Sequence, residues 1–265
     1  LESVALISGL VTDFSPLGNN PLLKYLDASG GVLADTSSLA GLTGLEELNI
    51  SSNHELQDIS DLSGLTSLAK LAMRDTPIAD ISALSTLAEL RDVDMSSSLV
   101  SDLSPLSTLT NLDTLDISKT KVGDVNALAG MANLKTLIMN GNVIYNIEAI
   151  SQDEVLESID FQFTLVDDIA PLATLTKLTW VNGTESNIAD LSSLVDASWP
   201  NLVEIDLVNT LVADLGPLVA NIDTFHNNVE INLWGAPLDC SAQAANIKTL
   251  RDRGVALYCD CGECL

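Results

Sequence analysis

Four cysteines near the end of the chain are the residues whose chemistry is easiest to recognise: Cys240, Cys259, Cys261 and Cys264. An even number of cysteines in one terminal segment predicts two disulfide bonds and an oxidising compartment, because cytosolic thiols are kept reduced. Cys240 paired with Cys259 or Cys261 would staple the segment between them, and the remaining pair would close a small loop. Four thiolates could instead hold zinc tetrahedrally, and a Cys-x-x-Cys pair could do redox chemistry. The uneven spacing and the lack of a surrounding thioredoxin-like unit favour disulfides.

Few residues of the chain could act as a nucleophile or a general base. The two histidines, His54 and His226, have no serine or cysteine partner at a recognisable motif spacing, although a nucleophile needs its base within hydrogen-bond reach. Paired carboxylates can hydrolyse glycosides, but an open surface gives little of the desolvation that raises the pKa of a catalytic acid. We therefore expect no enzymatic activity, no cofactor and no metal.

Aspartates recur at a regular spacing, each before a segment such as Asp-Ile-Ser or Asp-Leu-Ser-Pro-Leu. A side-chain oxygen at such a place is typical of a helix N-cap, because it accepts the N–H groups of the first turn. A ladder of calcium sites is the alternative. We favour capping because Asn146 fills the one gap in the series. The aspartates are Asp13, Asp35, Asp58, Asp80, Asp102, Asp124, Asp168, Asp190 and Asp214.

The charge of the chain excludes two classes of partner. It has 11 Lys and Arg against 37 Asp and Glu, a formal net charge of −26. Such a chain repels phosphate backbones and anionic membrane surfaces, so we expect neither nucleic acid nor membrane association. No apolar run approaches the roughly 20 residues of a membrane span. The acidity itself favours solubility and basic partners.

All these residues are positioned by a repeat of mostly 22 residues. Within one unit, Leu115 and Ile117 alternate with polar residues, which indicates a short strand with one buried face. Leu128 and Met131 then lie on a short helical or 3-10 return. One unit cannot bury its own apolar face, so neighbouring units must stack in register around a continuous core. The units begin at Leu1, Leu23, Leu45, Leu68, Leu90, Leu112, Leu134, Leu156, Leu178 and Leu202, and an eleventh contains Ile231, Leu233 and Leu238.

A second polar series occupies the turn that follows each strand. We expect these side chains to be buried and to satisfy the backbone of the adjacent turn. They are Asn53, Thr76, Ser98, Thr120, Asn142, Thr164, Ser186 and Thr210.

The pattern Leu-x-x-Leu-x-Ile-x-x-Thr/Asn-x-Ile-x-Asp-Ile-x-x-Leu resembles the leucine-rich repeat of bacterial internalins and related phosphatase-regulatory proteins, over about residues 1–240. The resemblance implies an α/β solenoid: a right-handed superhelix with a parallel β-sheet on its concave face and short helical or 3-10 returns on its convex face. It also implies recognition of another macromolecule, without identifying which one. Gly183 stands where an aliphatic residue is usual, so we expect a thin core or a register shift there.

The sequence divides into about 11 repeats over residues 1–239 and a C-terminal cap over residues 240–265 that holds the four cysteines. Ala244, Ile247 and Leu250 have helical spacing within residues 241–253, and residues 255–258 form a last strand. A terminal cap needs this combination of an apolar inner face and a polar outer face. Leu1 already occupies a repeat position, so we expect an upstream cap or domain.

The outward strand residues are the candidate binding surface. An Asp/Asn row along its middle is more simply a habit of the repeat than a cation site, and basic residues could neutralise it across strands. Phe163, Trp180 and Trp234 should be exposed, and aromatic residues dominate binding hot spots. The candidate contact residues are Tyr25, Lys70, Arg74, Asp94, Asp116, Asp160, Phe163, Trp180, Asp206 and Trp234.

These features predict a module for protein–protein recognition or adhesion. We expect a bacterial monomer that is secreted, displayed on the cell surface or periplasmic. Two alternatives remain: a carbohydrate or cell-wall binding module that uses the Asp/Asn row and the tryptophans, and a structural spacer in a larger surface protein. Asn49-Ile-Ser51 and Asn182-Gly-Thr184 are glycosylation sequons on the same surface, where a sugar would obstruct binding.

Overall fold

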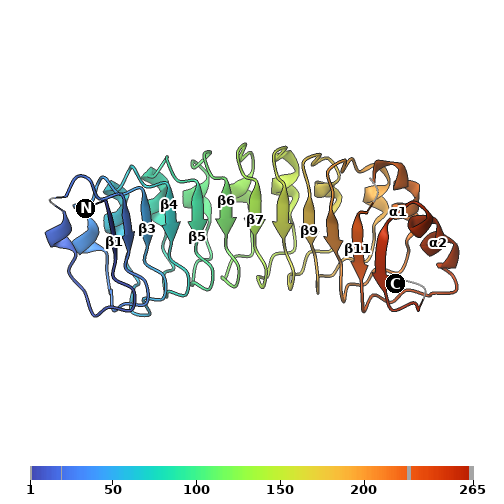
Figure 1. Cartoon of the computed structure of the whole chain (residues 1–265), viewed down its shortest axis with the longest axis horizontal. Coiled ribbons are helices and arrows are strands. Elements are labelled where there is room, and N and C mark those ends of the chain that lie inside the picture. Colours follow the sequence, from blue (N-terminus) through green and yellow to red (C-terminus); the bar gives the residue numbers. More distant parts are fainter. Residues whose placement is uncertain (1, 19, 226–227, 263–265) are drawn as a thin grey trace. The chain divides into compact units, whose positions relative to one another are not determined.

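Each repeat folds into a short strand followed by a return segment. The computed structural model describes residues 2–18, 20–225 and 228–262, so His226 and Cys264 lie outside the described residues. The chain divides into unit 1, Leu1–Leu134, and unit 2, Lys135–Leu265. Within each unit the strands form one layer and the return segments another (Figure 1). The prediction of short strands with 3-10 returns is confirmed.

Unit 1 contains six parallel strands, each hydrogen-bonded to the next in sequence. The strands are β1 (Ser3–Ala5), β2 (Tyr25–Asp27), β3 (Glu47–Asn49), β4 (Lys70–Ala72), β5 (Asp92–Asp94) and β6 (Thr114–Asp116). The 3-10 returns are η1 (Ser15–Leu17), η2 (Ser37–Leu39), η3 (Ser60–Gly64), η4 (Ser82–Thr86), η5 (Ser104–Leu106) and η6 (Asn126–Leu128).

Unit 2 also contains six parallel strands in sequence order. The strands are β7 (Thr136–Ile138), β8 (Ser158–Asp160), β9 (Trp180–Asn182), β10 (Glu204–Asp206), β11 (Glu230–Leu233) and β12 (Ala256–Cys259). The returns are η7 (Glu148–Gln152), η8 (Ala170–Leu172), η9 (Ser192–Asp196), α1 (Gly216–Ala220) with η10 (Ile222–Thr224), and α2 (Ala244–Asp252).

The core of each unit is built from the aliphatic positions of the repeat. Leu115, Ile117 and Leu128 are fully buried in unit 1, as are Ile159 and Leu172 in unit 2. Burial of each of these side chains contributes about 1.5–3 kcal/mol to the free energy of folding. Because the strand supplies one side of the core and the return supplies the other, the alternate strand residues face solvent.

The polar series at the turn is buried, as predicted, except that Thr120 is half-buried. Every member other than Ser98 donates a hydrogen bond to the carbonyl oxygen three residues earlier. Thr76 donates its hydroxyl hydrogen to the carbonyl oxygen of Met73 at 2.7 Å, and Thr164 donates to that of Phe161 at 2.6 Å. Asn53 does more: its Nδ2 donates to the carbonyl oxygens of Ile50 and Ala28 at 2.8 and 3.0 Å. Its Oδ1 accepts the Leu33 N–H at 2.9 Å. These bonds satisfy carbonyl groups that the turn would otherwise leave buried and unpaired.

Gly183 neither thins the core nor shifts the register. Val181 pairs with Ile159 and with Ile205, as an uninterrupted repeat requires. The fully buried ring of Phe161 occupies the space of the missing side chain, because a Cβ on Gly183 would lie 2.8 Å from its Cε2 atom. The large residue in one repeat compensates for the absent side chain in the next.

The C-terminal cap has the predicted helix and strand. Ile247 and Leu250 of α2 are buried, but Ala244 is exposed because it lies at the first residue of the helix. Cys240 and Cys261 form a disulfide with a Cα–Cα distance of 5.4 Å, which confirms one of the predicted pairings. Cys259 is also disulfide-bonded.

Replacing Asn53 by alanine should destabilise the protein by about 3 kcal/mol, because buried donors and acceptors would lose their partners. Urea unfolding followed by circular dichroism measures the loss. Asn111→Ala is the matched control, because Asn111 is exposed and donates only to the carbonyl oxygen of Ala88. Equal midpoints for the two variants would contradict the structural role of Asn53.

Removing the Cys240–Cys261 disulfide with a double alanine substitution should lower the free energy of unfolding by about 3 kcal/mol, because the bond closes a loop across 21 residues. The urea midpoint of the native chain should fall at least as far when a reductant is added, because the reductant also opens the disulfide of Cys259. Alkylation under denaturing, non-reducing conditions should leave both cysteines unmodified. A midpoint insensitive to both treatments would contradict the stapling role.

Candidate binding surfaces

The strand face of unit 1, the outward side of β1–β6, carries charges of both signs. Lys70 lies between Glu47 and Asp92 on the neighbouring strands, with Nζ–carboxylate distances of 3.8 and 3.6 Å. The Tyr25 hydroxyl donates to Asp27 Oδ2 at 3.3 Å. Exposed pairs of this kind contribute about 0–1 kcal/mol each. Strands β1–β6 hold five acidic residues and one lysine, so Lys70 neutralises only part of the charge of this surface. Its partners Glu47 and Asp92 lie outside the Asp/Asn row that the central bases were expected to neutralise.

The strand face of unit 2, the outward side of β7–β12, combines aromatic and acidic side chains. Trp180 is half-buried between Ser158 and Glu204, and Tyr258 pairs with Asn232 at the last strand. Strands β7–β12 contain the acids Asp160, Glu204, Asp206 and Glu230 and no lysine or arginine.

Glu204 records the crowding of negative charge on this face. Partial burial raises the pKa of its carboxyl group, and the charges of Asp206 and Glu230 raise it further. A cationic side chain placed against Glu204 would relieve that repulsion.

Only some of the other candidate contact residues lie next to one another in the structure. Arg74, on unit 1, is exposed. Asp160 and Asp206 flank Asn182 in one row of unit 2. Phe163, 52% exposed, lies on the turn beyond β8, and Trp234, 43% exposed, directly follows β11. The three aromatic residues Phe163, Trp180 and Trp234 therefore do not form one cluster.

The Asp/Asn row has a structural duty that the sequence did not reveal. Asp116 Oδ1 accepts the backbone N–H of Ser118 at 2.8 Å, and Asn182 Oδ1 accepts that of Thr184 at 3.0 Å. Each such bond turns the chain at the end of a strand. The same bond is made by Asp27, Asn49, Asp94, Asp160 and Asn232.

Burial restricts one of the two sequons. Asn182 is only 8% exposed, and both it and Asn49 use their side-chain oxygen to accept a backbone N–H of the turn. A glycan would be attached to the amide nitrogen and would leave that bond in place, so the low exposure of Asn182 is what disfavours glycosylation there.

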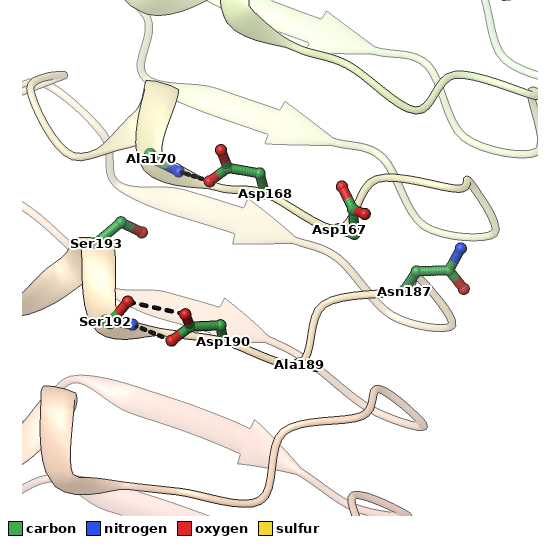
Figure 2. Close-up of a pocket in the computed structure, with 8 residues that line it drawn as sticks. All are labelled: Asp167, Asp168, Ala170, Asn187, Ala189, Asp190, Ser192 and Ser193. Atoms are coloured by element: carbon green, nitrogen blue, oxygen red, sulfur yellow. Dashed lines mark hydrogen bonds between the residues drawn. The ribbon is translucent and has the colours of Figure 1, made fainter.

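On the return side, the recurring aspartates accept backbone N–H groups at the start of the returns, but not from the N-cap position that the sequence predicts. Asp168 Oδ1 accepts the Ala170 N–H at 2.8 Å, and Asp190 accepts the N–H and the hydroxyl of Ser192 at 2.7 and 2.9 Å (Figure 2). Asn146 makes the equivalent bond with Glu148 N–H at 2.7 Å. The aspartates stand two residues before the first 3-10 residue, one residue earlier than an N-cap.

Hollows line the return side between successive repeats. Within the described residues no group of three His, Cys, Asp or Glu side chains is arranged to hold a metal ion. A hollow of about 300 Å³ is lined by Tyr145, Asn146, Ile147, Glu148, Asp167, Asp168 and Pro171. Its neighbour, lined by Asp167, Asp168, Asn187 and Asp190 among others, is larger, at about 670 Å³.

Three exposed apolar residues of unit 2 lie outside the binding surface predicted from the sequence: Val143, Tyr145 and Leu165. They lie beyond the strands, so inspection of outward strand positions alone misses them. The sequence does contain one signal for them: Tyr145 is aromatic at a repeat position that holds small or polar residues in the other repeats.

Solved structures share this architecture. An internalin from Listeria monocytogenes is 22% identical, with a TM-score of 0.77 and coverage of 98% of this chain and 81% of that one. Internalin C2 from the same organism is 30% identical, with a TM-score of 0.62 and coverage of 68% of this chain and 78% of that one.

A third similar structure is the leucine-rich-repeat ectodomain of the receptor kinase GASSHO1/SCHENGEN3 from Arabidopsis thaliana, in complex with CASPARIAN STRIP INTEGRITY FACTOR 2. It is 17% identical with a TM-score of 0.68, and the match covers 89% of this chain and 33% of that one. No protein-family model and no curated protein sequence matches the chain. Among the described residues, no helix has the length and apolar character to cross a membrane.

The aspartate caps predict a pH dependence. Hydrogen bonds from the Ser82 backbone and hydroxyl lower the pKa of Asp80 below 3.8. Because the folded-state pKa is depressed, the contribution of Asp80 to stability is present above about pH 4 and is lost as the pH falls through the lowered value.

Asp80→Ala should therefore lower the urea midpoint at pH 7, whereas Asp80→Asn should keep the bond, as Asn146 does. The difference between wild type and Asp80→Asn should shrink as the pH falls below about 4. If the alanine variant matches wild type at pH 7, the capping role is wrong.

Proposed function

Because this chain belongs to the leucine-rich-repeat proteins and carries internalin-like repeats, we propose that it binds another protein through outward-facing strand residues. The observation that carries the proposal is the strand face of unit 2, where Trp180 lies among carboxylates and the strands hold no lysine or arginine. We assign the principal contact to this face and not to the strand face of unit 1, where Lys70 lies between two carboxylates and no tryptophan is present in the strands.

Trp180 is the expected centre of the contact. Half-buried aromatic residues lose little conformational freedom on binding and contribute large contact areas, which is why tryptophan is enriched in hot spots. Its neighbours Ser158 and Glu204 are polar, so a partner could pack on the ring and satisfy them at its rim. Asp206 supplies a further acceptor in the adjacent row, whereas Asp160 is only 7% exposed and accepts bonds from Gln162 with both oxygens.

The partner should present a basic surface. Glu204, Asp206 and Glu230 lie close enough to raise the pKa of the Glu204 carboxyl group. Lysine or arginine side chains of a partner would remove this repulsion and accelerate association through electrostatic steering. The plant receptor similar to this chain, which was solved with a bound factor, supports the assignment of protein binding to this type of repeat.

We further propose that the protein is secreted or displayed on the surface of a bacterium. The Cys240–Cys261 disulfide supports an oxidising compartment, since such bonds rarely persist in the cytosol. The likeness to internalins of Listeria monocytogenes supports a bacterial source.

Parallel screens against an array of extracellular protein domains and an array of glycans test the proposal. We expect protein ligands, and for the tightest of them Trp180→Ser should raise Kd about tenfold or more. Serine matches Ser158 in the same row, so the fold should be retained. Val195→Ala, on the exposed surface of η9, is the control and should leave Kd unchanged.

Other outcomes would overturn the proposal. Glycan binding that Trp180→Ser abolishes would favour the carbohydrate-binding alternative. An absence of ligands on both arrays would favour a structural spacer. A protein ligand whose Kd is unaffected by Trp180→Ser would place the contact outside the strand face of unit 2.

A further inference from the structure

Phe163 occupies a left-handed backbone position, which residues other than glycine, asparagine and aspartate seldom adopt. It stands three residues after the last residue of β8, with a φ of 55° in the left-handed region. Every repeat has a residue with this conformation, and only Phe163 is aromatic among them. The series is Ser8, Gly30, Ser52, Asp75, Ser97, Lys119, Gly141, Phe163, Glu185, Asn209 and Gly235. A phenylalanine held there against its local conformational cost suggests a role for the side chain.

Tyr145 is exceptional in a second, independent series. The residue that directly precedes each capping aspartate or asparagine is small or polar in every other repeat. The series is Thr12, Ala34, Gln57, Ala79, Ser101, Gly123, Tyr145, Asp167, Ala189 and Ala213. Tyr145 is 65% exposed. The two departures fall in adjacent repeats of the same unit.

The local backbone places these side chains on one surface. Thr164 and Val166 point inward and are buried, so Phe163 and Leu165, which alternate with them, point outward. The preceding repeat alternates in the same way, with Val143 61% exposed. The Leu165 N–H donates to the carbonyl oxygen of Ile144 at 2.8 Å, which holds the two segments side by side. We call Val143, Tyr145, Phe163 and Leu165 the edge patch.

The edge patch is bordered by negative charge. Asp167 follows Leu165 in the outward series, and the hollow beside Tyr145 is also lined by Glu148 and Asp168. Residues 136–176 contain seven Asp and Glu and no Lys or Arg. An apolar patch with an acidic border complements a segment that is both apolar and basic.

We propose that the edge patch is a second docking site, which binds a basic amphipathic peptide segment of a partner protein. Apolar side chains of the segment pack on Phe163 and Leu165. A lysine or arginine lies against the Tyr145 ring, where the aromatic face and the Asp167 carboxylate both attract a cation. This site is separate from the strand face of unit 2 and does not depend on the contact assigned there.

Fluorescence anisotropy with a labelled twelve-residue peptide of alternating arginine and leucine tests the proposal. One companion peptide has glutamine in place of every arginine, and another has serine in place of every leucine. We expect the parent peptide to bind at least tenfold more tightly than either companion, because the site requires both chemistries.

Variants that copy other repeats locate the site without disturbing the fold. The double variant Tyr145→Ala/Phe163→Ser introduces residues found at the same positions elsewhere, and should weaken peptide binding about twentyfold. Asp167→Ala should weaken it severalfold. The controls are Leu99→Asn, at an exposed apolar position of unit 1, and Asp75→Ser; each should change Kd less than twofold.

Three results would overturn the proposal. Unchanged Kd in the double variant, with an unchanged urea midpoint, would exclude the edge patch. If the serine-containing peptide binds as tightly as the parent peptide, the apolar patch plays no part and the interaction is only electrostatic. If the glutamine-containing peptide binds as tightly as the parent peptide, the site does not require a basic partner. Loss of strand-face binding in Trp180→Ser leaves this test unaffected, so the two proposals fail separately.

Discussion

A single turn of this chain cannot bury its own apolar side chains, and the rest of the structure depends on that constraint. Leu115 or Ile159 leaves water only because a strand, a return and the next repeat surround it. Stacking in register then requires each turn to satisfy its buried carbonyl groups. The inward asparagine, threonine and serine residues do so, and Asn53 shows the arrangement most completely with bonds to three backbone groups.

The same constraint separates structural from available positions. Asp116 and Asn182 lie at outward strand positions, yet each shapes the turn after its strand, so a row that looks like a ligand site is largely committed to the backbone. Positions without such a duty are where a repeat can differ from its neighbours without losing a bond of the turn. Trp180, Tyr145 and Phe163 occupy those positions, and for this reason we assign binding to them.

Much of this arrangement could be predicted from the sequence, because repeat periodicity reports directly which side chains point inward. This periodicity predicts the strands and returns, the inward polar series, and the aspartates at the start of the returns. It does not predict contacts between particular repeats, since they depend on side-chain size. Phe161 fills the space above Gly183, and Trp180 is half-buried where full exposure was expected. The edge patch was missed because its residues lie outside the strands, and the contact residues themselves remain predictions.

Hydrogen–deuterium exchange of the chain with and without its captured protein partner tests the central claim most directly, since it reports which backbone segments the partner covers. Binding through outward strand residues predicts slower exchange in peptides that contain β8, β9 and β10, with Trp180 at their centre. Protection confined to the returns η8 and η9, or to unit 1, would contradict the assignment of the principal contact to the strand face of unit 2.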